Sequence, residues 1–254
     1  MTIRLNVKMR SCRGFTLLEL LFSVAISGII MSSVYFIYSS QQRSYLVQEQ
    51  VASMQQNLRA ALDLMEREIR MAGYDPTGDA DAKIIKADTA ELQFRIDFNE
   101  DGDFSNPSPP PANDPNEQIR YALTKDGDKD GIADSSPCHL GRETWGGGLR
   151  TVAENFDALN FVYLDERFSD GIDNDGDGTI DEYDEAIMAT PVANTEDIRA
   201  VQITLVARTG RVNPTYTDTG IYTNQQGTVI LPQQNDNFRR KRLTAQVCCR
   251  NLAF

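Results

Sequence analysis

The chain has 254 residues, of which 41% are hydrophobic and 24% are charged, and its formal net charge at pH 7 is −12. A wholly disordered chain is excluded, because the apolar content is that of a globular protein. The acidic balance argues against binding nucleic acid through a broad basic surface, and it suits the binding of cations.

The N-terminus combines a short basic segment with a long apolar stretch. Four basic residues and no acidic residue lie in the first 14 positions, and the 19 residues from Leu20 to Tyr38 carry no charge. A helix of about 20 such residues spans a bilayer. Secretory signal peptides have shorter apolar cores that end at a small-residue cleavage site, so we expect this stretch to remain in the mature protein. The basic flank predicts that the C-terminal part lies outside the cytoplasm.

Glu19 is the one charged residue between Phe15 and Tyr38. A carboxylate inside hydrocarbon costs on the order of 3 kcal/mol, so we expect it to have a specific partner. Glu19 follows Phe15 by four residues, which is about 6 Å along a helix. In a chain that began at Phe15, the free amino group of a neighbouring subunit would be a suitable partner.

The run RGFTLLE, from Arg13 to Glu19, resembles the type III signal of type IV prepilins and pseudopilins. The resemblance implies that a prepilin peptidase cleaves between Gly14 and Phe15, that Phe15 is then methylated, and that Glu19 acts in filament assembly. Residues 1–14 would be the leader peptide and residues 15–38 the transmembrane and filament-core helix. Other major and minor pilins would bind through this helix, after it leaves the inner membrane. The alternative is an ordinary N-terminal membrane anchor.

An amphipathic helix is expected to follow, over residues 39–73. Its apolar stripe recurs every three or four residues and consists of Val47, Val51, Met54, Leu58, Leu62, Met65 and Ile69. Gly73 and Pro76 end the pattern. One helix from Phe15 to Met71 would be about 85 Å long.

Residues 74–254 are predicted to form a β-rich head outside the cytoplasm. Leu92, Phe94, Ile96 and Phe98 alternate with polar residues, which is typical of a half-buried strand. Further strands are expected at Gln118–Thr124, Ala158–Leu164, Ile198–Arg208 and Leu243–Cys249, and a proline-rich loop at Asn106–Pro115. The fold class is therefore α+β, with a long N-terminal α-helix packed on an antiparallel β-sheet, as in pilins.

Three segments of the head space aspartate or asparagine at alternate positions before a glycine, a pattern that supplies oxygen ligands to Ca²⁺. The candidate ligands are Asp97, Asn99, Asp101 and Asp103 in the first; Asp126, Asp128, Asp130 and Asp134 in the second; and Asp173, Asp175, Asp177, Thr179 (through its carbonyl), Asp181 and Asp184 in the third. The predicted role of the ion is structural. The alternative for each segment is a solvated acidic loop.

The third segment matches a twelve-residue calcium loop most fully. Gly178 stands at the sixth position, where the chain bends sharply, and Ile180 at the eighth is expected to anchor the loop to the core. Asp184 occupies the last position, where such loops normally have glutamate, so its affinity is expected to be weak.

Cys138, Cys248 and Cys249 remain after cleavage of the leader, and no CxxC spacing is present. In an oxidising compartment Cys138 is expected to pair with Cys248 or Cys249, and free buried thiols are the alternative. The sequence contains no catalytic motif, and its one histidine, His139, is interpreted as structural, so we do not expect an enzyme.

Two looser likenesses refine the family. Arg70–Tyr74 and Arg239–Asn251 resemble the helix end and the closing segment of PilW-type minor pilins. The resemblance implies a minor pilin that primes pilus assembly and sits at or near the filament tip. It would cross the bacterial inner membrane once, with a periplasmic C-terminus, and later enter the extracellular pilus. The alternatives are a J-type pseudopilin of type II secretion and a membrane-tethered, calcium-dependent adhesin.

Overall fold

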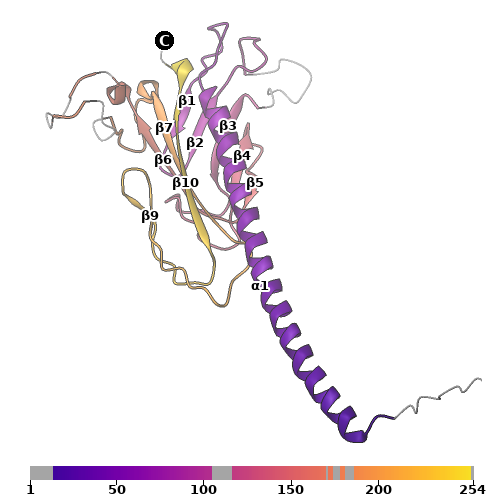
Figure 1. Ribbon diagram of the computed structural model, residues 1–254. Coiled ribbons are helices and arrows are strands. Elements are labelled where there is room, and N and C mark those ends of the chain that lie inside the picture. The colour runs from indigo at the N-terminus through magenta and orange to yellow at the C-terminus, as the bar shows by residue number, and fades with distance from the viewer. Residues whose placement is uncertain (1–13, 105–115, 170, 174–177, 181–185, 253–254) are drawn as a thin grey trace, which may run out of the picture. The chain divides into compact units, whose positions relative to one another are not determined.

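The computed structural model describes residues 14–104, 116–169, 171–173, 178–180 and 186–252. The described residues form one long helix, α1 (Leu17–Arg70), and ten strands (Figure 1). The strands are β1 (Ile84–Ala87), β2 (Leu92–Arg95), β3 (Gln118–Leu123), β4 (His139–Thr144), β5 (Arg150–Glu154), β6 (Phe156–Leu164), β7 (Ala200–Arg208), β8 (Tyr222–Thr223), β9 (Val229–Leu231) and β10 (Arg240–Cys248). Short 3-10 helices lie at Glu166–Ser169, Thr195–Asp197 and Arg250–Leu252.

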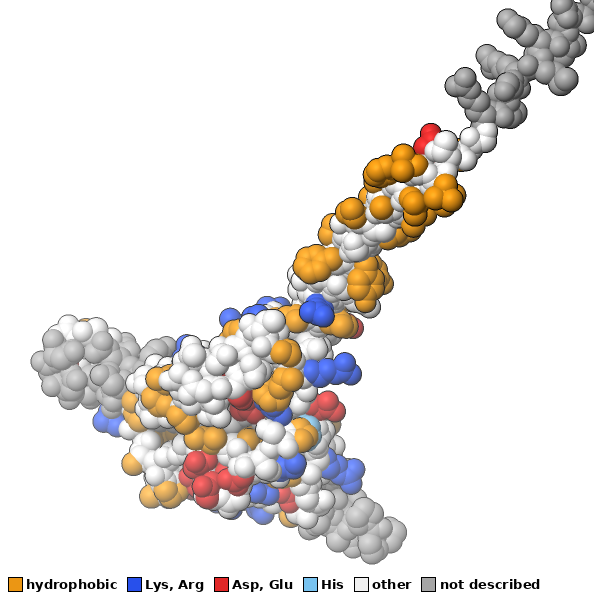
Figure 2. All heavy atoms as spheres, turned by 90° about the horizontal axis from the view of Figure 1, so that it is seen from below, with side chains coloured by type: hydrophobic (Ala, Val, Ile, Leu, Met, Phe, Trp, Pro, Cys, Tyr) orange, Lys and Arg blue, Asp and Glu red, His pale blue; other side chains and the backbone are white. Residues whose placement is uncertain are grey.

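The chain divides into two compact units, one ending at Gln48 and the other starting at Glu49. In the first unit, α1 is long and apolar enough to cross a membrane, and none of its most apolar stretch is buried. Hydrophobic side chains cover this part of the helix in Figure 2. An isolated apolar surface of this extent needs lipid or other protein chains around it.

The second part of α1 belongs to the second unit and has one buried face. The stripe residues from Met54 onward are buried, and Ala61 lies among them. Val51 is partly buried against the same core. The predicted amphipathic stripe is therefore confirmed from Val51 to Ile69, and the observed ends of the helix lie within two residues of the predicted ones.

Three antiparallel sheets follow the helix. Strands β1 to β5 form a five-stranded sheet in chain order, β10, β7 and β6 form a three-stranded sheet, and β8 pairs with β9. One hydrophobic core contains residues from α1, the five-stranded sheet and the three-stranded sheet. The α+β class with antiparallel strands is thus confirmed, although the strands divide among more than one sheet.

Polar anchors fix α1 to the five-stranded sheet. The hydroxyl of Tyr121, a buried residue of β3, donates to Glu68 Oε2 at 2.5 Å. Arg142 Nε on β4 donates to the same oxygen at 2.9 Å. Glu68 therefore sets the position of the last helical turns on this sheet, because its one oxygen satisfies two partly buried donors.

The segment between β7 and β10 packs on the three-stranded sheet. Ile230 and Leu231 of this segment pack with Ala158 of β6 and Val206 of β7. Asn224 Nδ2 donates to Asn160 Oδ1 at 3.1 Å, so a polar contact joins the same surfaces.

The predicted strands were found with small differences. The strand expected over Leu92–Phe98 ends at Arg95, because Asp97 starts a turn in which its carboxylate accepts hydrogen bonds from the backbone. The sequence analysis did not predict strands β1, β4, β5, β8 and β9. They are short, and their residues do not alternate cleanly between buried and exposed positions.

Candidate functional site

The first turn of α1 places Glu19 in a reciprocal arrangement with Thr16. Glu19 N donates to Thr16 Oγ1 at 3.2 Å, and Thr16 N donates to Glu19 Oε2 at 3.1 Å. The Thr16 hydroxyl also donates to Glu19 Oε2, at 3.0 Å. Thr16 precedes the helix and Glu19 is its third residue, so the pair is a capping box. The sequence T-x-x-E carries this signal, and the sequence analysis missed it.

This geometry gives Glu19 a role inside its own chain. Its carboxylate lies at the N-terminus of the helix, where the helix dipole favours negative charge. The side chain remains exposed, as do Gly14 and Phe15 at the predicted cleavage point. The processing residues and the assembly glutamate thus lie together at the accessible start of α1. Cleavage, methylation and assembly remain predictions.

The three aspartate loops begin with the same hydrogen bond. The first aspartate accepts from the amide of the glycine five residues later: Asp97 from Gly102 at 3.2 Å, Asp126 from Gly131 at 3.0 Å, and Asp173 from Gly178 at 2.9 Å. Each glycine has a positive φ, between +83° and +99°. In each loop this hydrogen bond turns the carboxylate of the first aspartate toward the glycine amide.

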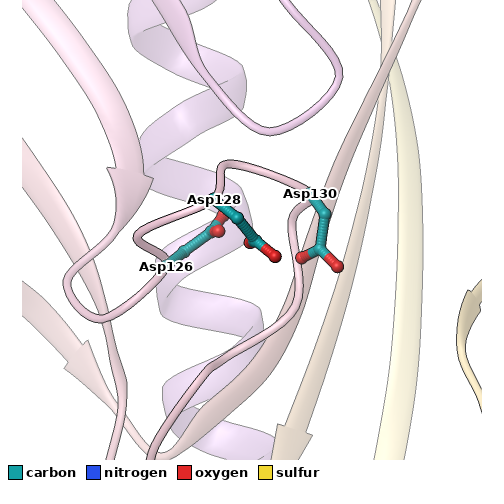
Figure 3. A group of neighbouring side chains, drawn as sticks. All are labelled: Asp126, Asp128 and Asp130. Atoms are coloured by element: carbon teal, nitrogen blue, oxygen red, sulfur yellow. The ribbon is translucent and has the colours of Figure 1, made fainter.

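The second loop, residues 126–134, gathers its carboxylates. Oxygens of Asp126, Asp128 and Asp130 lie within 4.8 Å of one another, and Figure 3 shows the three side chains around one turn between β3 and β4. Asp134 Oδ2 accepts from Gly127 N of the same loop at 2.6 Å. The structure therefore brings three of the four predicted ligands together and places the fourth against the loop backbone.

Asp126 is the most perturbed acid of this loop. Its Oδ1 atom is buried and has no hydrogen-bond partner among the described residues. Burial raises the pKa of Asp126, and the nearby carboxylates of Asp130 and Asp128 raise it further. A cation bound among the three carboxylates would remove this repulsion and give Oδ1 a partner.

The first loop, residues 97–103, satisfies more of its own polar groups. Asn99 donates to Asp101 Oδ2 at 3.0 Å, while Asp101 Oδ1 accepts from Asp103 N at 3.1 Å. Asp97 is fully buried and accepts from Glu100 N at 2.8 Å as well. Hydrogen bonds within the loop therefore hold these side chains in place.

A fourth loop of this kind escaped the sequence analysis. Asp75 accepts from Ala80 N at 3.0 Å and from Gly78 N at 2.7 Å. Although burial acts to raise the pKa of Asp75, these hydrogen bonds lower it overall. The spacing of Asp75, Thr77 and Asp79 repeats the alternate-residue pattern, but threonine in place of an acid hid it.

Most predicted ligands of the third loop, Asp175, Asp177, Asp181 and Asp184, lie outside the described residues. The prediction for Ile180 is wrong. Its side chain is 57% exposed, so it does not anchor the loop in the core. Thr179 is exposed as well.

The three cysteines among the described residues are free. Cys138 and Cys249 are buried in the main core, and Cys248 is exposed. The predicted bridge from Cys138 is therefore not formed, and the alternative of free thiols describes the structure. Cys248 and Cys249 also lie on opposite faces of the chain as β10 ends, which separates their sulfur atoms.

His139 has a structural contact, as expected for a lone histidine. Its Nδ1 accepts from Asn155 N at 3.3 Å, at the bend between β5 and β6. Trp145, which follows β4, is partly buried under the Arg95 guanidinium, 5.6 Å from the ring centroid.

Comparison with known proteins gives two family matches. Residues 152–251 match the family described as Type IV Pilus-assembly protein W, and residues 9–35 match the family described as Prokaryotic N-terminal methylation motif. None of the curated proteins matches the chain. A solved structure of a type IV-like pilin from Thermus thermophilus is similar, with 13% sequence identity, 78% of this chain and 97% of that chain covered, and a TM-score of 0.43.

The two family matches fall on the parts of the chain that carry the features described above. The methylation motif contains Gly14, Phe15 and the capping box, and it extends into the apolar part of α1. The pilus-assembly family covers the whole three-stranded sheet and the segment between β7 and β10. The two family matches support a type IV pilin-like protein of the PilW type.

Proposed function

We propose that this chain is a minor pilin that helps to prime assembly of a type IV pilus and is then incorporated at or near the filament tip. Pilins are structural subunits, and the chain is accordingly not an enzyme. The observation that carries the proposal is the start of α1, where the predicted cleavage site is followed by a capping box with an exposed glutamate and then by a long apolar stretch of the helix.

Before assembly the apolar part of α1 would hold the protein in the bacterial inner membrane. The sheets would then lie in the periplasm, because the basic leader stays in the cytoplasm. A prepilin peptidase would cleave after Gly14, and α1 would later leave the membrane to pack among the helices of other pilins. Heterologous contacts that do not close on themselves build such filaments.

Glu19 would form an ion pair with the Phe15 amine of a neighbouring subunit. The capping box supports this, because it holds the carboxylate at the exposed N-terminal end of the helix. The test uses Glu19→Gln, since glutamine preserves a capping box but carries no charge. We expect this variant to be processed normally and to be depleted by about tenfold or more from sheared filaments, because it loses a charged interaction in a low-dielectric site.

The matched control is Thr16→Val, which removes the hydroxyl of the cap and keeps the carboxylate. We expect it to retain more incorporation than Glu19→Gln, because the charge is the essential feature. Immunoblots of sheared filaments and of membranes measure incorporation and processing separately. Wild-type incorporation of Glu19→Gln would contradict the proposed ion pair.

The PilW match favours a pilus over the type II secretion alternative, whose J-type pseudopilins share the same leader. A pilus subunit would be recovered in sheared pili, and its deletion would leave protein secretion unchanged. These two results separate the pilus from the secretion alternative. An adhesin that never enters a filament would stay with the membrane in the same experiment.

Calcium is the second part of the proposal. Ions bound in the aspartate loops would fix the conformation of long connections between strands. The strongest support is the Asp126 loop, where three carboxylates converge and one buried oxygen has no described partner. Extracellular sites of this kind bind calcium with dissociation constants of roughly 0.1–1 mM.

A further inference from the structure

Strand β10, the yellow strand in Figure 1, ends the three-stranded sheet and pairs with β7 on one side alone. Its nine residues pair with those of β7 without a register shift. Just beyond the two ends of the ladder, Thr209 N donates to Arg239 O at 2.9 Å and Cys249 N donates to Arg199 O at 2.8 Å. In an antiparallel ladder such pairs alternate with pairs whose backbone groups point away from each other. The backbone groups of odd-numbered β10 residues therefore face β7, and those of even-numbered residues face outward.

The outward backbone groups in the middle of β10 belong to Arg242, Thr244 and Gln246. Among the described residues, none outside the ladder forms a hydrogen bond with the backbone N–H or C=O of these three. Arg242 is exposed, and Thr244 and Gln246 are partly exposed, so the row is open to solvent. Such a row can bind a further strand, because each free donor and acceptor then gains a partner.

The other edges of the two larger sheets, as far as the structure describes them, are covered or interrupted. Val192 N donates to Ala87 O of β1 at 2.9 Å, so a connecting segment covers that edge. Leu159 N of β6 donates to Gly131 O at 2.9 Å, and a second connecting segment thus covers β6. Strand β5 is short, has a register shift in its pairing with β4, and carries exposed charged residues at both ends. Edge strands are commonly protected in these ways against unwanted pairing.

Strand β10 lacks these protections along most of its length. It contains no proline, its ladder has no bulge, and the six residues from Leu243 to Cys248 carry no charge. The exposed charges of β10 lie at its first end, on Lys241 and Arg242. Arg242 Nη1 donates to Thr223 O at 2.6 Å, and this contact leaves its charge without a carboxylate partner. A long open edge of this kind promotes aggregation unless a partner strand occupies it.

We propose that the outer edge of β10 is a docking site for an extended, acidic segment of another pilus subunit, which adds to the three-stranded sheet as a further strand. This inference rests on the proposed function, which brings other subunits beside this chain, and it adds a contact besides those of α1. Backbone hydrogen bonds to Arg242, Thr244 and Gln246 would hold the segment. Its acidic residues would lie beside Lys241 and Arg242, because complementary charges fix the register of a partner.

Residue-resolved hydrogen exchange of the full chain in detergent tests the inference. The probes are the other pilins of the same organism, purified in detergent and added one at a time. We expect one of them, at about ten times its dissociation constant, to slow exchange by about tenfold at the amides of Arg242, Thr244 and Gln246. The amides of Leu243 and Ala245 face β7 and should change less. This alternation distinguishes an added strand from general coverage of the surface.

The variant Thr244→Pro removes one outward N–H and keeps the ladder with β7, since an edge strand tolerates proline where the N–H faces outward. We expect it to weaken the association by about tenfold, because a hydrogen bond is lost and the ring meets the added strand. The matched control is Thr244→Val, which keeps the N–H and the branched side chain and should bind as the wild type does. Circular dichroism in detergent checks that both variants fold.

Association of a pilin without the alternating slowing in β10 would overturn the inference, as would wild-type affinity of Thr244→Pro. The absence of association with every one of the other pilins would overturn it too. If Thr244→Pro does not fold, the exchange pattern of the wild type decides alone. These results are separate from entry of the chain into filaments through α1, which the Glu19→Gln experiment tests.

Discussion

Arg240 shows how single residues hold the second unit together. Its side chain is 3% exposed, and its guanidinium contacts three carboxylates, those of Asp157, Asp218 and Asp236, at 2.6–2.9 Å. The acids come from β6 and from the segment between β7 and β10, so one side chain joins that segment to the sheet. Hydrogen bonds to Asp236 and Asp218 raise the pKa of Arg240 despite its burial, which keeps it charged throughout the ordinary pH range.

We predict that Arg240→Ala lowers the free energy of unfolding by about 3–5 kcal/mol, because it leaves Asp157 and Asp218 buried without their main counter-charge. Chemical denaturation of the full chain in detergent measures the change. Lys241→Ala is the matched control, since Lys241 is an exposed neighbour in the same strand and its loss should cost less than about 0.5 kcal/mol. Equal stability of the two variants would refute this role for Arg240.

At the residue scale, the start of each aspartate loop could be predicted from the sequence. An aspartate and a glycine five residues later form a turn through a local hydrogen bond. The loop that gathers three carboxylates also forms hydrogen bonds with β6, a contact distant in sequence that the local pattern does not reveal. The same limit explains the error at Ile180, whose exposure depends on what lies opposite the loop.

At the scale of elements, the end of α1 depends on Gly73. The residue adopts φ +79°, and its amide donates to Arg95 O at 3.0 Å. A Cβ atom there would lie 2.4 Å from Leu252 Cδ2. The glycine thus ends the helix in a left-handed conformation and lets the C-terminal 3-10 helix pack against it.

We predict that Gly73→Ala lowers the unfolding free energy by about 2–4 kcal/mol, from backbone strain of about 1–2 kcal/mol and overpacking of similar size. Gly78→Ala is the control, because Gly78 has nearly the same φ, +77°, but no atom lies within 4 Å of its added Cβ. Gly78→Ala should lower the unfolding free energy by the backbone strain alone. If both substitutions cost the same, the contact with Leu252 does not contribute to stability.

Elements with strong periodicity were predicted well, and short ones were not. The helix repeats its apolar residues over many turns, and β6 and β7 are long and rich in apolar residues. Strand β5 has five residues and a register shift in its pairing with β4, so no alternation marks it in the sequence. The chain passes from the five-stranded to the three-stranded sheet between β5 and β6, at Asn155, which has φ +63°.

At the scale of the whole molecule, the two compact units differ in what stabilises them. The second unit buries a core shared by helix and sheets, whereas the first exposes apolar side chains along a helix. A protein with this division needs a bilayer or a bundle of similar helices for its first unit. Removal of a basic leader would allow the helix to pass from the bilayer into a bundle of similar helices. This transfer is our central claim.

N-terminal sequencing and intact-mass measurement of the protein from sheared filaments and from inner membranes test that claim most directly. We predict that the mature chain begins at Phe15, with a methylated amino group, in filaments and in part of the membrane pool. A protein that keeps Met1 in both fractions, or that is recovered only from membranes, would contradict the account.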